Sequence, residues 1–168
     1  MELLKNFNKN KLSFPSIKIY SICLFIAILI FTIDRISKNI ILELLINKKT
    51  IYINDFLNLE LIWNLGIGFG LLSSKSSLIH YLISSIIGLV IIFIMFLIFK
   101  SKLIDKILFS IILGGAMGNF YDRIVFMAVP DFIDFHYLNF HWFTFNIADI
   151  FITIGIIAII LKDLFIKE

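Results

Sequence analysis

Residues 76–99 read SSLIHYLISSIIGLVIIFIMFLIF, and this uncharged stretch decides the class of the fold. A helix needs roughly 20 apolar residues to cross about 30 Å of hydrocarbon, and this stretch is long enough without its neighbours. The rest of the chain agrees, because 60% of its 168 residues are apolar and its mean hydropathy is +1.01. Soluble domains hold about 45–50% apolar residues, so the sequence predicts a membrane protein.

Three shorter uncharged runs reach spanning length only by including a carboxylate at one end: Ile19–Ile33 with Asp34, Ile107–Tyr121 with Asp122, and Ile150–Leu161 with Asp149. We therefore predict four membrane-spanning helices in one domain that covers residues 1–168, at about residues 18–38, 76–99, 106–124 and 145–162. Three carboxylates are thereby forced to the edge of the apolar layer. Ionisable groups are costly there, so a functional role is their default explanation.

The lysines predict how the chain is oriented. They lie in the N-terminal arm, in the connection 100–106 and at the C-terminus, with Lys18, Lys106 and Lys162 next to the spans. Loops rich in Lys and Arg face the cytoplasm, so both termini are expected inside. At 1.5 Å per residue, the three carboxylates then lie roughly 20–24 Å above these lysines, at one level near the outer face.

Two segments are expected outside the membrane, at about residues 35–75 and 122–146. Alternating apolar and polar residues over Leu57–Trp63 predict a strand, and Asn54 and Asp55 predict a turn before it. Gly66, Gly68 and Gly70 permit sharp bends. The second segment is rich in aromatic residues, as is typical of the interface between membrane and water. The predicted fold class is an all-α polytopic membrane protein with a small extracytoplasmic β-sheet.

Most polar residues near the span ends belong to four motifs: DRISK at 34–38, NLGIGF at 64–69, GGAMGNFYDR at 114–123, and the pair VPDF at 129–132 with FNIAD at 145–149. Two adjacent carboxylates can share one proton, so that one acts as an acid while the other acts as a base. By position alone, either Asp122 or Asp131 can be the partner of Asp149.

In their combination and order, from about Asp34 to Asp149, these motifs resemble those of the lipoprotein signal peptidase (signal peptidase II) family of aspartyl proteases. The resemblance implies that Asp131 and Asp149 are catalytic, and that no cofactor is needed. It implies a supporting or substrate-binding role for Asp34, Lys38, Asn64, Gly66, Gly115, Asn119, Asp122, Arg123, Asn146 and Ala148. Leu65, Ile67 and Gly68 depart from the residues usual in the family, which leaves substrate preference open.

The same resemblance implies the reaction and its setting. The enzyme is expected to remove signal peptides from diacylglyceryl-modified prolipoproteins by cutting before the lipidated Cys. It is expected in the bacterial cytoplasmic (inner) membrane, as a monomer, with its active site near the outer face. Its expected partners are these substrates and membrane lipid, and nucleic acid is not among them.

Several of these residues also have a purely structural interpretation. Asp34 and Lys38 share a helix face and can protect each other from an unpaired state at the lipid edge. Gly114, Gly115 and Gly118 suit close helix packing. Asn146 can cap the last helix or orient a catalytic carboxylate. Asp122 and Arg123 can form an interfacial ion pair, and small Ala148 can keep space for substrate.

Other classes of function have less support. The single Cys23 excludes a disulfide framework, and His80, His136 and His141 lack the spacing of a metal-ligand motif, so no metal is expected. Glycine patterns for binding nucleotides are absent from the sequence. The alternative function is a small proton-coupled transporter or channel, because intramembrane Asp, Asn and Arg also mark ion pathways. The sequence contains no inverted repeat that favours this alternative.

Overall fold

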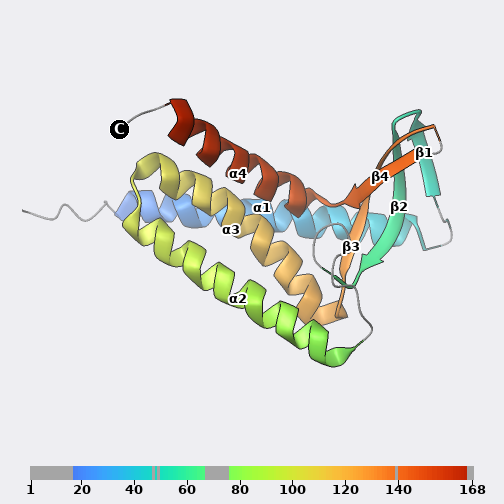
Figure 1. Cartoon of the computed structure of the whole chain (residues 1–168), viewed down its shortest axis with the longest axis horizontal. Coiled ribbons are helices and arrows are strands. Elements are labelled where there is room, and N and C mark those ends of the chain that lie inside the picture. The colour runs from blue at the N-terminus through green and yellow to red at the C-terminus, as the bar shows by residue number, and fades with distance from the viewer. Residues whose placement is uncertain (1–16, 47, 49, 67–75, 139, 166–168) are drawn as a thin grey trace, which may run out of the picture.

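A computed structural model describes residues 17–46, 48, 50–66, 76–138 and 140–165. The elements in this part of the chain are, in order, α1 (Ile17–Leu44), β1 (Thr50–Asn54), β2 (Leu57–Asn64), α2 (Ser77–Lys100), α3 (Leu103–Phe126), β3 (Val129–Tyr137), β4 (Phe140–Phe145) and α4 (Ile147–Phe165). The sheet lies at one end of the helices, while the α2–α3 connection and the end of α4 lie at the other (Figure 1). The predictions for the N-terminal arm and for Ile67, Gly68 and Gly70 lie outside the described residues.

Three of the helices, α1, α2 and α3, are long and apolar enough to cross a membrane. The predicted spans at residues 76–99 and 106–124 agree with α2 and α3 within a few residues, but α1 continues past residue 38 to Leu44. The fourth helix begins at Ile147 rather than near residue 145, because β4 continues to Phe145. This helix has 19 residues, which include the charged residues Asp149, Lys162 and Asp163. It is not among the three helices that are long and apolar enough to cross a membrane.

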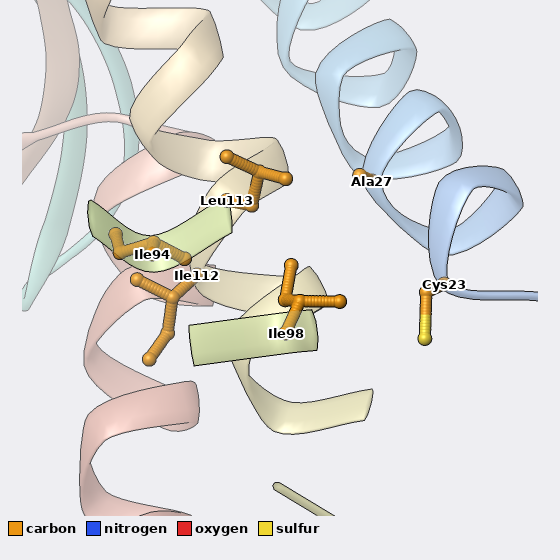
Figure 2. Packing of buried hydrophobic residues seen from close by; sticks show 6 residues of the cluster. All are labelled: Cys23, Ala27, Ile94, Ile98, Ile112 and Leu113. Carbon is orange, nitrogen blue, oxygen red and sulfur yellow. The ribbon is translucent and has the colours of Figure 1, made fainter. Parts of the chain in front are cut away.

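The third helix lies at the centre of the helical layer and packs against α1, α2 and α4. The core between the first three helices contains Cys23 and Ala27 of α1, Ile94 and Ile98 of α2, and Ile112 and Leu113 of α3 (Figure 2). Many large apolar side chains on the outside of the helices remain exposed, Leu89, Ile92 and Phe25 among them. Exposed apolar surface of this extent is what a lipid environment covers.

Small residues let the backbones of α3 and its neighbours approach closely, as the glycine motif predicted. A Cβ atom on Gly114 would lie 2.7 Å from the carbonyl oxygen of Ala27, and one on Gly115 would lie 2.6 Å from that of Ala148. On Gly118, it would collide with the carboxylate of Asp34. These glycines therefore bring α1 and α4 to the same level of α3, where the polar residues meet.

The sheet contains both of the segments expected outside the membrane. Its strands are antiparallel in the order β1-β2-β3-β4, and the predicted strand at Leu57–Trp63 is confirmed as β2. The aromatic segment after α3, which the sequence relates to the interface between membrane and water, forms the hairpin of β3 and β4. Asp131 therefore lies in a strand, opposite Ile62 of β2.

The extension of α1 beyond the predicted span packs against this sheet. Ile41 and Leu45 form a second apolar core with Phe132 of β3, against which Leu59 and Ile133 also pack. This contact explains why the helix continues past Lys38, since its last turns bury apolar surface against the sheet. It also fixes the sheet relative to the helices.

Candidate active site

A cavity of about 320 Å³ opens where the sheet meets the helices. Its polar lining comes from Asp131 of β3, Asp149 of α4, Asn119 and Arg123 of α3, and Asn64 of β2. The rest of the lining is largely apolar, and includes Ile87, Phe143 and Phe145. The two carboxylates predicted to form a catalytic pair thus face one space from different elements.

Amide groups hold the carboxylate of Asp131 on both sides. Asn64 donates its side-chain amide to Oδ2 at 2.9 Å, and Asn146 donates to Oδ1 at 2.6 Å. The residue is buried, with 4% of its surface exposed. Burial and the negative charge of Asp149 raise the pKa of Asp131 to about 6, and the hydrogen bonds from Asn64 and Asn146 oppose that rise.

The first turn of α4 positions Asp149. The side-chain oxygen of Asn146 accepts a hydrogen bond from the backbone N–H of Asp149 at 3.1 Å, and the Asp149 carboxylate accepts one from the backbone N–H of Asn146 at 3.1 Å. This reciprocal pair is a helix cap with an acidic residue at its third position. Asn119 donates a further hydrogen bond to Oδ1 of Asp149 at 2.8 Å. Asn146 therefore both caps α4 and contacts Asp131.

A buried ammonium group organises the residues behind the cavity. Lys38 has no exposed surface, and its Nζ donates to Asp34 at 2.8 Å, to Asn119 at 2.9 Å and to Asp122 at 2.7 Å. Arg35 approaches the other oxygen of Asp122 at 2.6 Å. Because Asn119 accepts from Lys38 and donates to Asp149, the positive charge polarises the amide that holds the carboxylate.

The second oxygen of Asp34 joins α1 to α4. It accepts a hydrogen bond from the backbone N–H of Ala148 at 3.0 Å, in the first turn of α4, where backbone donors lack partners within the helix. The contact of Asp34 with Gly118 shows why no side chain is tolerated there. The pairing of Asp34 with Lys38 predicted from their spacing is confirmed, within a larger network.

The turn after β2 connects Arg123 to the cavity. Asn64 accepts a hydrogen bond from the backbone N–H of Gly66 at 3.0 Å, and the carbonyl of Gly66 accepts one from Nη2 of Arg123. The Nε and Nη1 atoms of Arg123 are buried and have no hydrogen-bond partner among the described residues. They remain available as donors to a molecule in the cavity.

Comparison with known proteins agrees with these observations. The family described as "Signal peptidase (SPase) II" matches residues 26–165. A lipoprotein signal peptidase of Pelagibacter ubique is 51% identical over 152 residues, which cover 89% of this chain and 92% of that protein. One from Aquifex aeolicus is 39% identical, over 84% of this chain and 85% of that protein.

A solved structure is also similar. It is described as a bacterial membrane enzyme determined by the in meso method at 2.3 Å resolution. The TM-score is 0.72 at 31% sequence identity, over 88% of this chain and 92% of that one.

The chain belongs to the signal peptidase II family.

Eleven of the twelve residues predicted for the site belong to one connected set of side chains and backbone groups, which Ala148 joins through its backbone N–H. The structure assigns the remaining residue, Gly115, to helix packing. Gly115 lies against the backbone of Ala148, and Ala148 is fully buried, so it does not keep space for substrate at the cavity wall. Asp122, the alternative partner of Asp149, is held by Lys38 and Arg35 and does not line the cavity.

Two parts of the site are not predicted from the sequence: Arg35, and the aromatic wall formed by Phe143 and Phe145. Arg35 belongs to the DRISK motif, and its position beside Asp34 is the signal that indicates it. The aromatic residues were assigned to the interface as a group, because their strand was not recognised. Nothing in the spacing of residues 140–145 indicated which of them face a cavity.

We expect Lys38→Met to destabilise the protein strongly, because it leaves Asp34 and Asp122 buried with fewer positive partners. Breaking a buried ion pair from one side costs about 3–5 kcal/mol. The measurement is the free energy of unfolding in detergent or, where unfolding is irreversible, the melting temperature. Lys162→Met is the control, since Lys162 pairs with Asp105 and Asp163 at the other end of the helices. Equal melting temperatures for the Lys38 variant and the wild type would contradict the assigned role of this residue.

Proposed function

We propose that Asp131 and Asp149 form the catalytic dyad of this signal peptidase II family member. The enzyme is a membrane aspartic endopeptidase that removes signal peptides from prolipoproteins, the activity named for its relatives. The observation that carries the assignment is that these two carboxylates face one cavity, while Asp34 and Asp122 are paired with cations behind it. The transporter alternative finds no support among these relatives.

The dyad supplies the acid and the base that hydrolysis of a peptide bond requires. With one proton shared between the carboxylates, the ionised member removes a proton from water as the water attacks the scissile carbonyl. The protonated member donates to the carbonyl oxygen, and a proton later reaches the leaving amine. Asn64, Asn119 and Asn146 fix the carboxylates before substrate arrives, so little reorganisation accompanies the reaction.

The lining of the cavity suits a substrate anchored in lipid. Apolar side chains of α2 and β4 border the carboxylates. The N–H groups of Arg123 that have no partner among the described residues can donate to a peptide carbonyl or a lipid phosphate. We therefore propose that the substrate carries a diacylglyceryl group on the Cys after the cleavage site. The lipid stays in the bilayer and holds the scissile bond at the level of the dyad.

The arrangement in the membrane completes the proposal. We propose that α4 is a fourth span, that the chain acts as a monomer in the bacterial inner membrane, and that both termini are cytoplasmic. The support is that the sheet and the dyad lie at the end opposite the C-terminal end of α4 and the lysine-rich α2–α3 connection (Figure 1). The cavity is then near the outer face.

We expect a reporter fused after the C-terminal residue to read cytoplasmic, since Lys162 lies near that end. A reporter inserted in the β1–β2 turn at Asp55 should read external. The measurement is the paired activity of alkaline phosphatase, which folds only outside, and a fluorescent protein that folds inside. An external reading for the C-terminal fusion would reverse the proposed orientation.

We expect Asp131→Asn and Asp149→Asn each to reduce cleavage by about 10²–10⁴-fold or more, because each removes one member of an acid–base pair. The assay follows product mass from a purified prolipoprotein, with and without its diacylglyceryl group. The unlipidated substrate should react more slowly with the wild-type enzyme. Equal rates for the two substrates would contradict the proposed role of the lipid.

Two further variants serve as controls for the dyad. Asp163→Asn changes an exposed carboxylate at the far end of α4 and should keep full activity. Asp122→Asn should mainly lower the melting temperature, since Asp122 contacts Lys38 and does not line the cavity. The cleavage rate of the enzyme that remains folded should change less. One combined result would assign the dyad to Asp122 and Asp149 instead. In that result, the Asp122→Asn enzyme is folded but inactive, and the Asp131→Asn enzyme keeps its activity.

The raised pKa of Asp131 gives a prediction for the dependence on pH. The form of the dyad with both carboxylates ionised lacks its acid, so kcat/KM should fall as pH rises through about 6. Asn64→Ala removes a hydrogen bond that stabilises the charged form, so the pKa of Asp131 should rise and the decline should move to higher pH. Asn54→Ala, at the end of β1, should leave the profile unchanged. An unmoved decline in the Asn64 variant would show that Asp131 does not set it.

A further inference from the structure

A second group of ionisable side chains lies on the β3–β4 hairpin, apart from the cavity. It consists of Asp134 and His136 of β3 and His141 of β4, and we call it the hairpin cluster. His136 and His141 are directly opposite each other in the register of the two strands. None of the three lines the cavity, and none takes part in the proposed reaction.

Both imidazoles of the hairpin cluster approach the same carboxylate oxygen. Oδ2 of Asp134 lies 2.8 Å from Nδ1 of His141 and 3.6 Å from Nδ1 of His136. The two rings stack with centroids 5.2 Å apart. One ligand atom from each residue lies within 4.8 Å of the other two. Three groups able to bind a metal ion therefore surround one point.

The protein's own hydrogen bonds leave this cluster incomplete. His136 is 7% exposed, and its Nδ1 atom has no hydrogen-bond partner among the described residues. Asp134 is 1% exposed and lies beside it. A buried polar atom without a partner costs about 1–3 kcal/mol, so its presence calls for an explanation. A cation bound between the three groups would satisfy both the carboxylate and the free ring nitrogen.

The ligand types indicate which cation fits. Imidazole nitrogen suits zinc and its neighbours among the transition metals, whereas Mg²⁺ and Ca²⁺ prefer a set of oxygen ligands. Zinc binds nitrogen and oxygen at about 2.0–2.2 Å, which separates tetrahedral ligand atoms by roughly 3.4 Å. The separations of 2.8 and 3.6 Å in the hairpin cluster lie on either side of that value. His141 has 54% of its side chain exposed, which leaves a path for the ion and a place for a water ligand.

We propose that Asp134, His136 and His141 form a zinc-binding site that ties β3 to β4. One of these strands carries Asp131, and the other leads into Asn146 and Asp149. The ion would hold the hairpin and stay outside the reaction. The site does not depend on the proposed function, because its ligands belong to a separate cluster.

Binding of Zn²⁺ to the purified full chain in detergent tests the proposal directly. The protein should carry a purification tag without histidines and be stripped with a chelator first. Titration calorimetry and elemental analysis should then give one zinc per chain. Binding should raise the melting temperature, and Co²⁺ should give the visible absorption of a tetrahedral nitrogen–oxygen site. Mg²⁺ should show no saturable binding.

Variants separate this site from chance binding elsewhere. His141→Ala should abolish the stoichiometric zinc. Because the His141 side chain is exposed, the variant should stay folded, which the melting temperature of the metal-free variant checks. Asp134→Asn should weaken binding at least tenfold. His80→Ala is the matched control, since His80 lies in α2 beside Ser84, and it should keep one zinc. The absence of stoichiometric zinc in the wild type, or its retention in both hairpin variants, overturns the proposal.

Discussion

The buried ammonium group of Lys38 is the contact on which the half of the molecule next to the sheet depends. A lysine at the edge of an apolar layer is tolerated only when its charge and its donors are satisfied. Asp34, Asn119 and Asp122 satisfy all three donors, and they come from α1 and α3. Through Asp34 the same network reaches the first turn of α4. Three helices are thereby fixed at one height by one cation, and the glycines of α3 provide the room for it.

In this arrangement, the contacts that stabilise the fold also position the proposed dyad. Asn119 is satisfied by Lys38 on one side and holds Asp149 on the other, while Asn146 both caps α4 and holds Asp131. A structural contact therefore fixes the orientation of each amide, so that its N–H group points at the carboxylate of Asp131 or Asp149. Such prior orientation is what electrostatic catalysis requires, because donors that are already aligned need not reorganise during the reaction.

The sequence predicted the features that depend on residues close to each other in the chain. Hydrophobic length indicated the helices, period-two alternation indicated β2, and the four-residue spacing of Asp34 and Lys38 indicated their pairing. It did not indicate β3 and β4, because both faces of β3 are largely buried near Asp131 and alternation is lost there. Contacts between distant residues were likewise out of reach: Asp122 meets Lys38 across 84 residues, and no local pattern shows which carboxylate a lysine selects. The contacts of Arg35 and the hairpin cluster were not predicted for the same reason, since they exist only where separate elements pack together.

The formal charges around the cavity explain how it can receive a peptide. Asp34 and Asp122 are balanced by Arg35 and Lys38, which leaves Arg123 as the remaining cation of this described group, beside the dyad. If the proposed dyad shares one proton, it carries a single negative charge, which Arg123 balances, so that this group of residues is neutral. A neutral peptide bond can then enter without leaving an uncompensated charge in a site of low dielectric. Loss of the shared proton would add a second negative charge at this site, and the described residues of this group include no further cation to balance it. The single-proton form is therefore both the one that the chemistry needs and the one that the surrounding charges favour.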